Sequence, residues 1–207
     1  MEQKIIYLSI VSAVVPIFIG TTAIKKTSSP IFWLILILCI VSFASDIVSS
    51  AYYLLLSRSN YWIINIYQIA EITLVGCFFY LYLNTKKIVI IITAIIIIYF
   101  LYQILILNFY SFYGTTLAIR SLANILFCIM VFYQFYKSEQ ELFIEQSPIF
   151  WINIGLLTYF SGALFSFLLS ANILNIQSDL NWQFHNIANI LKNIFFAIGL
   201  WKVRAVA

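Results

Sequence analysis

Long runs of apolar side chains, each about as long as a bilayer is thick, follow one another along this sequence from end to end. A helix that crosses the hydrocarbon core of a membrane needs about 20 mostly apolar residues. Only 9% of the 207 residues are charged, against roughly a quarter in an average soluble domain. A soluble globule, a disordered chain and a coiled coil all need more polar surface than that. The composition therefore predicts an all-α integral membrane protein.

Short polar segments divide the apolar sequence into seven parts, each long enough to cross a membrane once. Pro30 suits the start of the second part, because proline is favoured in the first turn of a helix. Seven spans leave no room for a soluble domain, so we expect one transmembrane domain. Its predicted helices are 5–24, 31–56, 61–83, 88–107, 116–136, 149–170 and 182–201.

Basic residues are unevenly distributed over the two sides of the predicted membrane. Seven of them flank the helices on the side of the C-terminus, and only Lys4 and Arg58 lie on the side of the N-terminus. By the positive-inside rule, the N-terminus is predicted outside and the C-terminus in the cytoplasm. All five tryptophans lie near predicted helix ends, where aromatic residues gather at membrane interfaces.

The second and sixth predicted helices open with the same five residues, Ser-Pro-Ile-Phe-Trp, at 29–33 and 147–151. The third and seventh helices also begin alike, after Asn60 and Asn181. The pattern predicts two parallel three-helix copies joined by the fourth helix, and parallel repeats are a known transporter plan. The alternative is that Ser-Pro followed by an aromatic residue is a good membrane-entry signal that occurs twice.

Four aspartate, glutamate, lysine or arginine residues lie inside predicted helices: Asp46, Glu71, Arg120 and Lys192. A charge at the bilayer centre costs about 2.5 to 3.5 kcal/mol on insertion scales, so such residues normally face the bundle interior, pair and carry function. Glu71 and Lys192 have opposite charge and nearly equal depth along their helices. We therefore predict a direct or water-bridged pair between the third and seventh helices.

Polar residues also share one face of several predicted helices. At 100° per residue, those between His185 and Asn193 fall within an arc of about 120°. Faces this polar avoid lipid and are expected to meet in the bundle interior. The alternative is that asparagine and serine merely join helices through hydrogen bonds. The predicted ligand-binding or intramembrane polar site consists of Asp46, Asn65, Gln68, Glu71, Arg120, Asn124, His185, Asn189, Lys192 and Asn193.

Several kinds of chemistry lack support in the sequence. The single histidine and the absence of a Cys-x-x-Cys motif argue against a metal site. Phosphate-loop, nucleophile-elbow and zinc-protease motifs are absent as well. We expect no enzymatic activity, no cofactor and no nucleic-acid partner. Retinal on Lys192 would resemble the rhodopsin arrangement, but Ala188 stands where microbial rhodopsins commonly have an acidic residue.

One group of residues in the last two predicted helices forms a recognisable set. It consists of Tyr159-Phe160-Ser161-Gly162, Phe165, Trp182, His185-Asn186-Ile187, Asn189-Ile190, Lys192-Asn193-Ile194 and Phe196-Ala197. The set resembles the seven-helix membrane sensor module of certain bacterial histidine kinases and of related stand-alone membrane proteins. The resemblance implies a bacterial inner membrane location. Because no kinase domain follows in this sequence, it also implies a separate cytoplasmic signalling partner or a homo-oligomer.

Three functions remain open at this point. The favoured one is a receptor-like or sensor-like protein whose polar pocket, open to the outside, binds a small molecule or a lipid. The second is a small transporter or channel built on the parallel repeat, with Glu71 and Lys192 beside the path. The third is an accessory membrane protein of a stress response or of a defence locus such as a CRISPR system.

Overall fold

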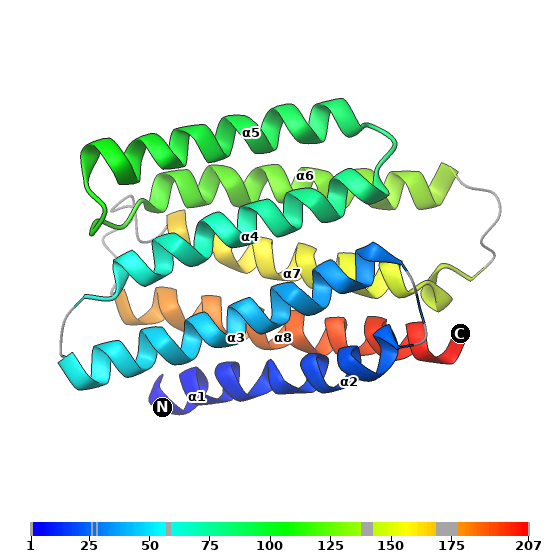
Figure 1. Cartoon of the computed structure of the whole chain (residues 1–207), viewed down its shortest axis with the longest axis horizontal. Coiled ribbons are helices and arrows are strands. Elements are labelled where there is room, and N and C mark those ends of the chain that lie inside the picture. Colours follow the sequence, from blue (N-terminus) through cyan, green and yellow to red (C-terminus); the bar gives the residue numbers. More distant parts are fainter. Residues whose placement is uncertain are drawn as a thin grey trace.

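Long helices lying side by side make up one elongated bundle (Figure 1). The computed structural model describes residues 2–25, 27, 29–56, 59–137, 143–168 and 178–206. In this part of the chain the regular structure is helical throughout, which confirms the predicted all-α class. Six helices are long and apolar enough to cross a membrane.

The helices lie close to their predicted positions. The first predicted helix has two parts, α1 (Glu2–Ser12) and α2 (Val14–Ile24), which meet at Ala13. A π-helical turn, η1 (Gln103–Leu107), extends α5, and a 3-10 helix, η2 (Ile144–Gln146), precedes α7. The remaining helices are α3 (Pro30–Leu56), α4 (Tyr61–Tyr82), α5 (Lys86–Tyr102), α6 (Gly114–Lys137), α7 (Pro148–Leu168) and α8 (Ser178–Val206).

Prolines explain several of these boundaries. Both α3 and α7 begin at the proline of the repeated five-residue segment, as expected for a residue that suits a helix start. Inside the first span, Pro16 has no backbone N–H to donate and its ring crowds the preceding turn. The break at Ala13 lies within that turn. The duplication itself stays a prediction.

Some predicted features fall outside the described residues. They include the last two residues of the sixth predicted helix, the following loop at 171–177, and the basic residues Lys26 and Arg58. The acidic residues Glu139 and Glu141 are also outside.

The seventh long helix, α8, is the most polar one and is not among the six apolar spans. Its polar residues Asn189, Lys192 and Asn193 are nevertheless buried, whereas Ile187 and Ile194 are exposed. Polar residues inside and apolar residues outside are the arrangement expected of a helix that faces lipid. This distribution confirms the predicted inward polar face of α8.

An apolar core fills the half of the bundle that contains the C-terminal end of α8 (Figure 1). Helices α3, α4, α6, α7 and α8 contribute to it. Glycines bring α7 and α8 close together, since a Cβ on Gly155 would lie only 2.9 Å from Cδ1 of Phe196. The other half contains most of the buried polar side chains together with a second apolar cluster from α4, α5, η1, α6 and α7, and the candidate site lies there.

Candidate functional site

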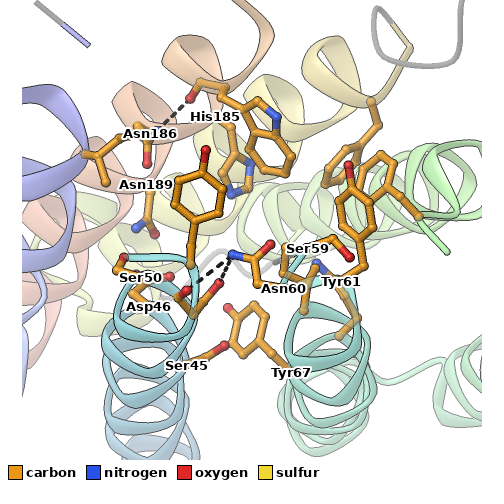
Figure 2. Close-up of a pocket in the computed structure, with 18 of the residues that line it drawn as sticks. Ser45, Asp46, Ser50, Ser59, Asn60, Tyr61, Tyr67, His185, Asn186 and Asn189 are labelled. Atoms are coloured by element: carbon orange, nitrogen blue, oxygen red, sulfur yellow. Dashed lines mark hydrogen bonds between the residues drawn. The ribbon is translucent and has the colours of Figure 1, made fainter. Parts of the chain in front are cut away.

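A cavity of about 650 Å³ opens at the end of the bundle where α1 begins. Figure 2 shows it between the last turns of α3, the first turns of α4 and the start of α8. Its polar lining consists of Ser45, Asp46, Ser49, Ser50, Ser59, Asn60, Gln68, Gln183, His185, Asn186 and Asn189. Its aromatic lining consists of Tyr53, Tyr61, Tyr67, Phe112, Phe167 and Trp182.

Four of the predicted site residues line this cavity: Asp46, Gln68, His185 and Asn189. They come from three helices that are distant in sequence, so the fold brings them together as the polar stripes suggested. Asn60, just before α4, donates from Nδ2 to the backbone oxygen of Ser49 at 3.4 Å and also bonds the Ser49 hydroxyl. This contact ties the end of α3 to the start of α4 beside the cavity (Figure 2).

Glu71 and Arg120 form an ion pair between α4 and α6, one turn of α4 deeper than the cavity. The side chains are only 2% and 1% exposed. The hydroxyl of Tyr67 donates to Oε1 of Glu71 at 2.9 Å. Because Tyr67 also lines the cavity, the floor of the cavity is hydrogen-bonded to the ion pair.

The predicted direct pair between Glu71 and Lys192 is wrong, because Arg120 is the ion-pair partner of Glu71. Nζ of Lys192 lies instead 4.3 Å from the ring centroid of Tyr159 on α7. The reason is the packing: α4 contacts α6, whereas α8 contacts α7 and the α1–α2 span. Equal depth in the membrane therefore did not identify neighbouring helices. Lys192 still interacts electrostatically with Glu71 across the interior, and a water-bridged contact stays a prediction.

The asparagines among the predicted residues mainly join elements. Nδ2 of Asn189 donates to the Ser9 hydroxyl at 2.9 Å, and Nδ2 of Asn193 donates to the Ser12 hydroxyl at 2.8 Å. Both bonds hold α8 against α1. Nδ2 of Asn65 donates to the backbone oxygens of Phe109 and Ser111, at 2.9 and 3.1 Å.

Asn65 therefore fixes the segment between η1 and α6, beside the cavity. Asn124 is buried within α6 and is not a lining residue. The sequence-based alternative of asparagine as a helix joiner thus describes the contacts of Asn65 and Asn193. Ligand binding by any of the ten residues stays a prediction.

Sequence reasoning missed the aromatic side of the site. His185 lies among the rings of Tyr159, Phe167 and Trp182, with centroid distances of 5.5, 5.8 and 5.8 Å. Tyr67 was identifiable, because it precedes Glu71 by four residues and i,i+4 side chains meet on a helix. Tyr61 also had a signal, because it lies seven residues before Gln68 on the same polar face. The remaining aromatic residues carry no such signal among so many in this chain, and only the tertiary structure gathers them.

Some buried polar atoms near the cavity have no hydrogen-bond partner among the described residues. They are Oδ1 of Asn65, Oε1 of Gln68, Nδ1 of His185, and Nε and Nη2 of Arg120. Native proteins leave few such groups unpaired, so each one calls for water or a ligand. The interior of this half of the bundle therefore retains unused hydrogen-bonding capacity.

No protein-family model matches this chain, and no curated protein or solved structure matches it either. The resemblance to sensor modules therefore does not assign the chain to a family. The length and apolarity of its helices and the inward polar face of α8 instead define the chain's class. It is a multi-pass membrane protein.

Proposed function

We propose that this chain is a receptor-like membrane protein whose cavity binds a small molecule or a lipid. The observation that carries the proposal is the cavity itself. Its volume of about 650 Å³ falls within the roughly 300 to 1,000 Å³ of small-molecule sites. Its mixture of aromatic walls and a few polar groups is also the usual composition of such sites.

A path for the signal is supported by the contacts below the cavity. A ligand that touches Tyr67 affects the hydrogen bond from its hydroxyl to Glu71, and Glu71 is ion-paired to Arg120 on another helix. Ligand binding would thereby bias the packing of α4 against α6. The output would be a helix movement passed to a separate partner, as the resemblance to sensor modules implies.

The packing of the other half of the bundle supports a receptor more than an open channel. Large apolar side chains such as Phe78, Phe79 and Phe160 fill that half and leave the cavity closed below. The distribution of lysine and arginine, seven against two, supports an outward-facing cavity.

A transporter is the second candidate, and the buried charges favour it. Glu71, Arg120 and Lys192 are all nearly inaccessible, and ionisable residues within membrane spans often mark a substrate pathway. Transport would require the apolar core to open during each cycle. Uptake of a ligand into proteoliposomes, rather than binding alone, would favour this candidate.

Cysteine labelling along α8 tests the position and access of the cavity. In a background with the native cysteines replaced, we expect His185→Cys and Asn189→Cys to react with a membrane-impermeant thiol reagent added outside. Ile190→Cys and Ile194→Cys should stay unlabelled, because Ile194 is exposed on the opposite face, where lipid excludes the reagent.

Lys202→Cys, near the other end of α8, is the control for sidedness and should react only after permeabilisation. Equal reactivity at all four positions of the helix would contradict the cavity. Reaction of Lys202→Cys from outside would contradict the orientation alone.

Co-purifying molecules test ligand binding directly. Mass spectrometry of extracts from the purified chain should find a bound small molecule or lipid that is lost in Ser50→Trp, which narrows the cavity. Ile194→Trp adds the same side chain on the lipid face and should retain the molecule. If the unchanged chain, Ser50→Trp and Ile194→Trp all carry the same molecules in equal amounts, the cavity is not a binding site.

A further inference from the structure

The charges around the cavity indicate what kind of ligand it accepts, provided that it is the binding site proposed above. Asp46 supplies a carboxylate to the lining, and the described lining residues include no lysine or arginine. Asp46 is half-buried and takes part in no ion pair among the described residues. A carboxylate that is partly removed from water is stabilised more by a cationic partner than by a neutral one.

The deeper charges do not replace such a partner. Lys192 and Glu71 act on Asp46 with opposite sign, Lys192 the more strongly, so their effects cancel only in part. Arg120 is held by Glu71, and neither Arg120 nor Lys192 is a lining residue. Among the described residues, no lysine or arginine faces Asp46 from the cavity.

The aromatic lining fits the rest of such a ligand. Tyr61, Phe112 and Trp182 form a continuous set of rings. The ring centroid of Phe112 lies 5.7 Å from that of Tyr61 and 6.0 Å from that of Trp182. They come from α4, the segment before α6, and α8, whereas Asp46 comes from α3. Aromatic faces attract cations and also bury apolar groups.

A free hydrogen-bond acceptor adds a third, independent indication. Gln68 lines the cavity, is buried, and has no partner for Oε1 among the described residues. An ammonium group offers up to three N–H donors and accepts none. A carboxylate, an unpaired amide oxygen and aromatic faces are together the recognition elements of an organic cation.

We infer that the cavity binds an organic ammonium compound, with the charged nitrogen toward Asp46 and an apolar group against the aromatic residues. Two sources share this chemistry: a free amine and the ammonium headgroup of a membrane lipid. The serines and asparagines of the lining would also suit a neutral hydroxylated ligand, which makes that class an outcome of the test.

The test uses the full chain in maltoside detergent, which carries no ammonium group. The probes are 2-phenylethylammonium, benzyltrimethylammonium, the neutral 2-phenylethanol and the anionic 3-phenylpropanoate. Calorimetry and the shift of the unfolding temperature report binding. We expect both cations to bind about 30-fold more tightly than the neutral probe, since a partly buried charge contact is worth about 2 kcal/mol or more.

Asp46→Asn should lower the affinity for both cations about 30-fold and leave the affinity for the neutral probe unchanged. Glu145→Gln is the matched control, because it removes the same charge from an exposed residue of η2 and should change nothing. Trp182→Leu tests the aromatic contact at a residue that is 39% exposed. It should weaken cation binding about threefold even if Asp46→Asn fails to fold.

Lipid addition separates the two sources. If phosphatidylethanolamine competes with the probes and phosphatidylglycerol does not, the ammonium group belongs to a lipid headgroup. If neither competes, it belongs to a free amine.

Equal or tighter binding of the neutral or anionic probe would overturn the inferred ligand charge while leaving the cavity a binding site. So would cation affinity that survives both Asp46→Asn and Trp182→Leu. If no probe binds and no molecule co-purifies, the proposed function fails together with this inference.

Discussion

Each buried charged residue of the ion pair, and Lys192, has a partner in the interior of this bundle that stabilises its charge. The Glu71 carboxylate accepts one hydrogen bond from Arg120 and one from Tyr67. Arg120 is also near the Phe160 ring, at 5.6 Å from its centroid, and Lys192 lies over Tyr159. A cation over an aromatic face is stabilised without a counter-ion, which explains how Lys192 is accommodated at 2% exposure.

The ion pair gives the first residue-scale prediction. We expect Glu71→Gln and Arg120→Met each to lower the free energy of unfolding by about 3 to 5 kcal/mol, because each leaves a buried charge unpaired. The double variant should lose clearly less than the two costs added together. Reversible unfolding in mixed detergent measures the free energy of unfolding of the unchanged chain, the two single variants and the double variant.

A second cycle with Glu71→Gln and Lys192→Met is the control. Lys192 forms no ion pair with Glu71 among the described residues, so its coupling energy should be smaller than that of Arg120. An additive Glu71–Arg120 cycle, or a larger coupling to Lys192, would contradict the pairing.

Helix pairs set the geometry of the site, and α7 and α8 form the tightest contact. Gly155 and Gly162 on α7 and Gly199 on α8 meet the partner helix at distances that leave no room for a Cβ atom. Small residues at such positions allow close backbone approach, which drives helix association in membranes. The α7–α8 contact in turn fixes the direction in which the polar face of α8 points.

Gly162 provides the test of this contact. Its missing side chain faces Cβ of Ala188, so Gly162→Leu should force the helices apart and cost about 1 to 3 kcal/mol of unfolding free energy. The roughly 1 kcal/mol that replacing a helical glycine gains offsets part of this cost. Ser161→Leu introduces the same side chain at the exposed neighbour and should leave the unfolding free energy unchanged. Equal losses in both variants would contradict the tight contact.

For the whole molecule, the number of crossings depends on α8. Within the described ranges, six helices qualify as membrane spans by length and apolarity, and α8 does not because of its polar face. A bundle that buries this face removes the cost of placing it in lipid. We therefore expect seven crossings, with the C-terminus in the cytoplasm.

Reporter fusions after Ala207 and within 171–177 measure this directly. The two should report opposite sides of the membrane, with the C-terminal fusion cytoplasmic. A reporter fused between α4 and α5, at Asn84, should agree with the C-terminal one. Reports from the same side for the first two fusions would mean that α8 lies along the membrane and does not cross it.

Much of the architecture followed from the sequence alone. The bilayer requires about 20 apolar residues per crossing and internal satisfaction of every backbone group. Helix positions could therefore be predicted to within a few residues, and the polar faces of α4 and α8 identified the interior. The same argument located Asp46, Gln68, His185 and Asn189 on faces that do line one cavity.

Only the tertiary structure decided how these residues are paired and which space stays open. Depth along a helix gives the position of Glu71 across the membrane but not which helix lies beside it, so its partner is Arg120 and not Lys192. A cavity is the volume that packing leaves unfilled, and its aromatic walls come from segments that no local pattern connects. The sequence determined what had to face inward, because lipid excludes it, and packing decided what each inward residue touches.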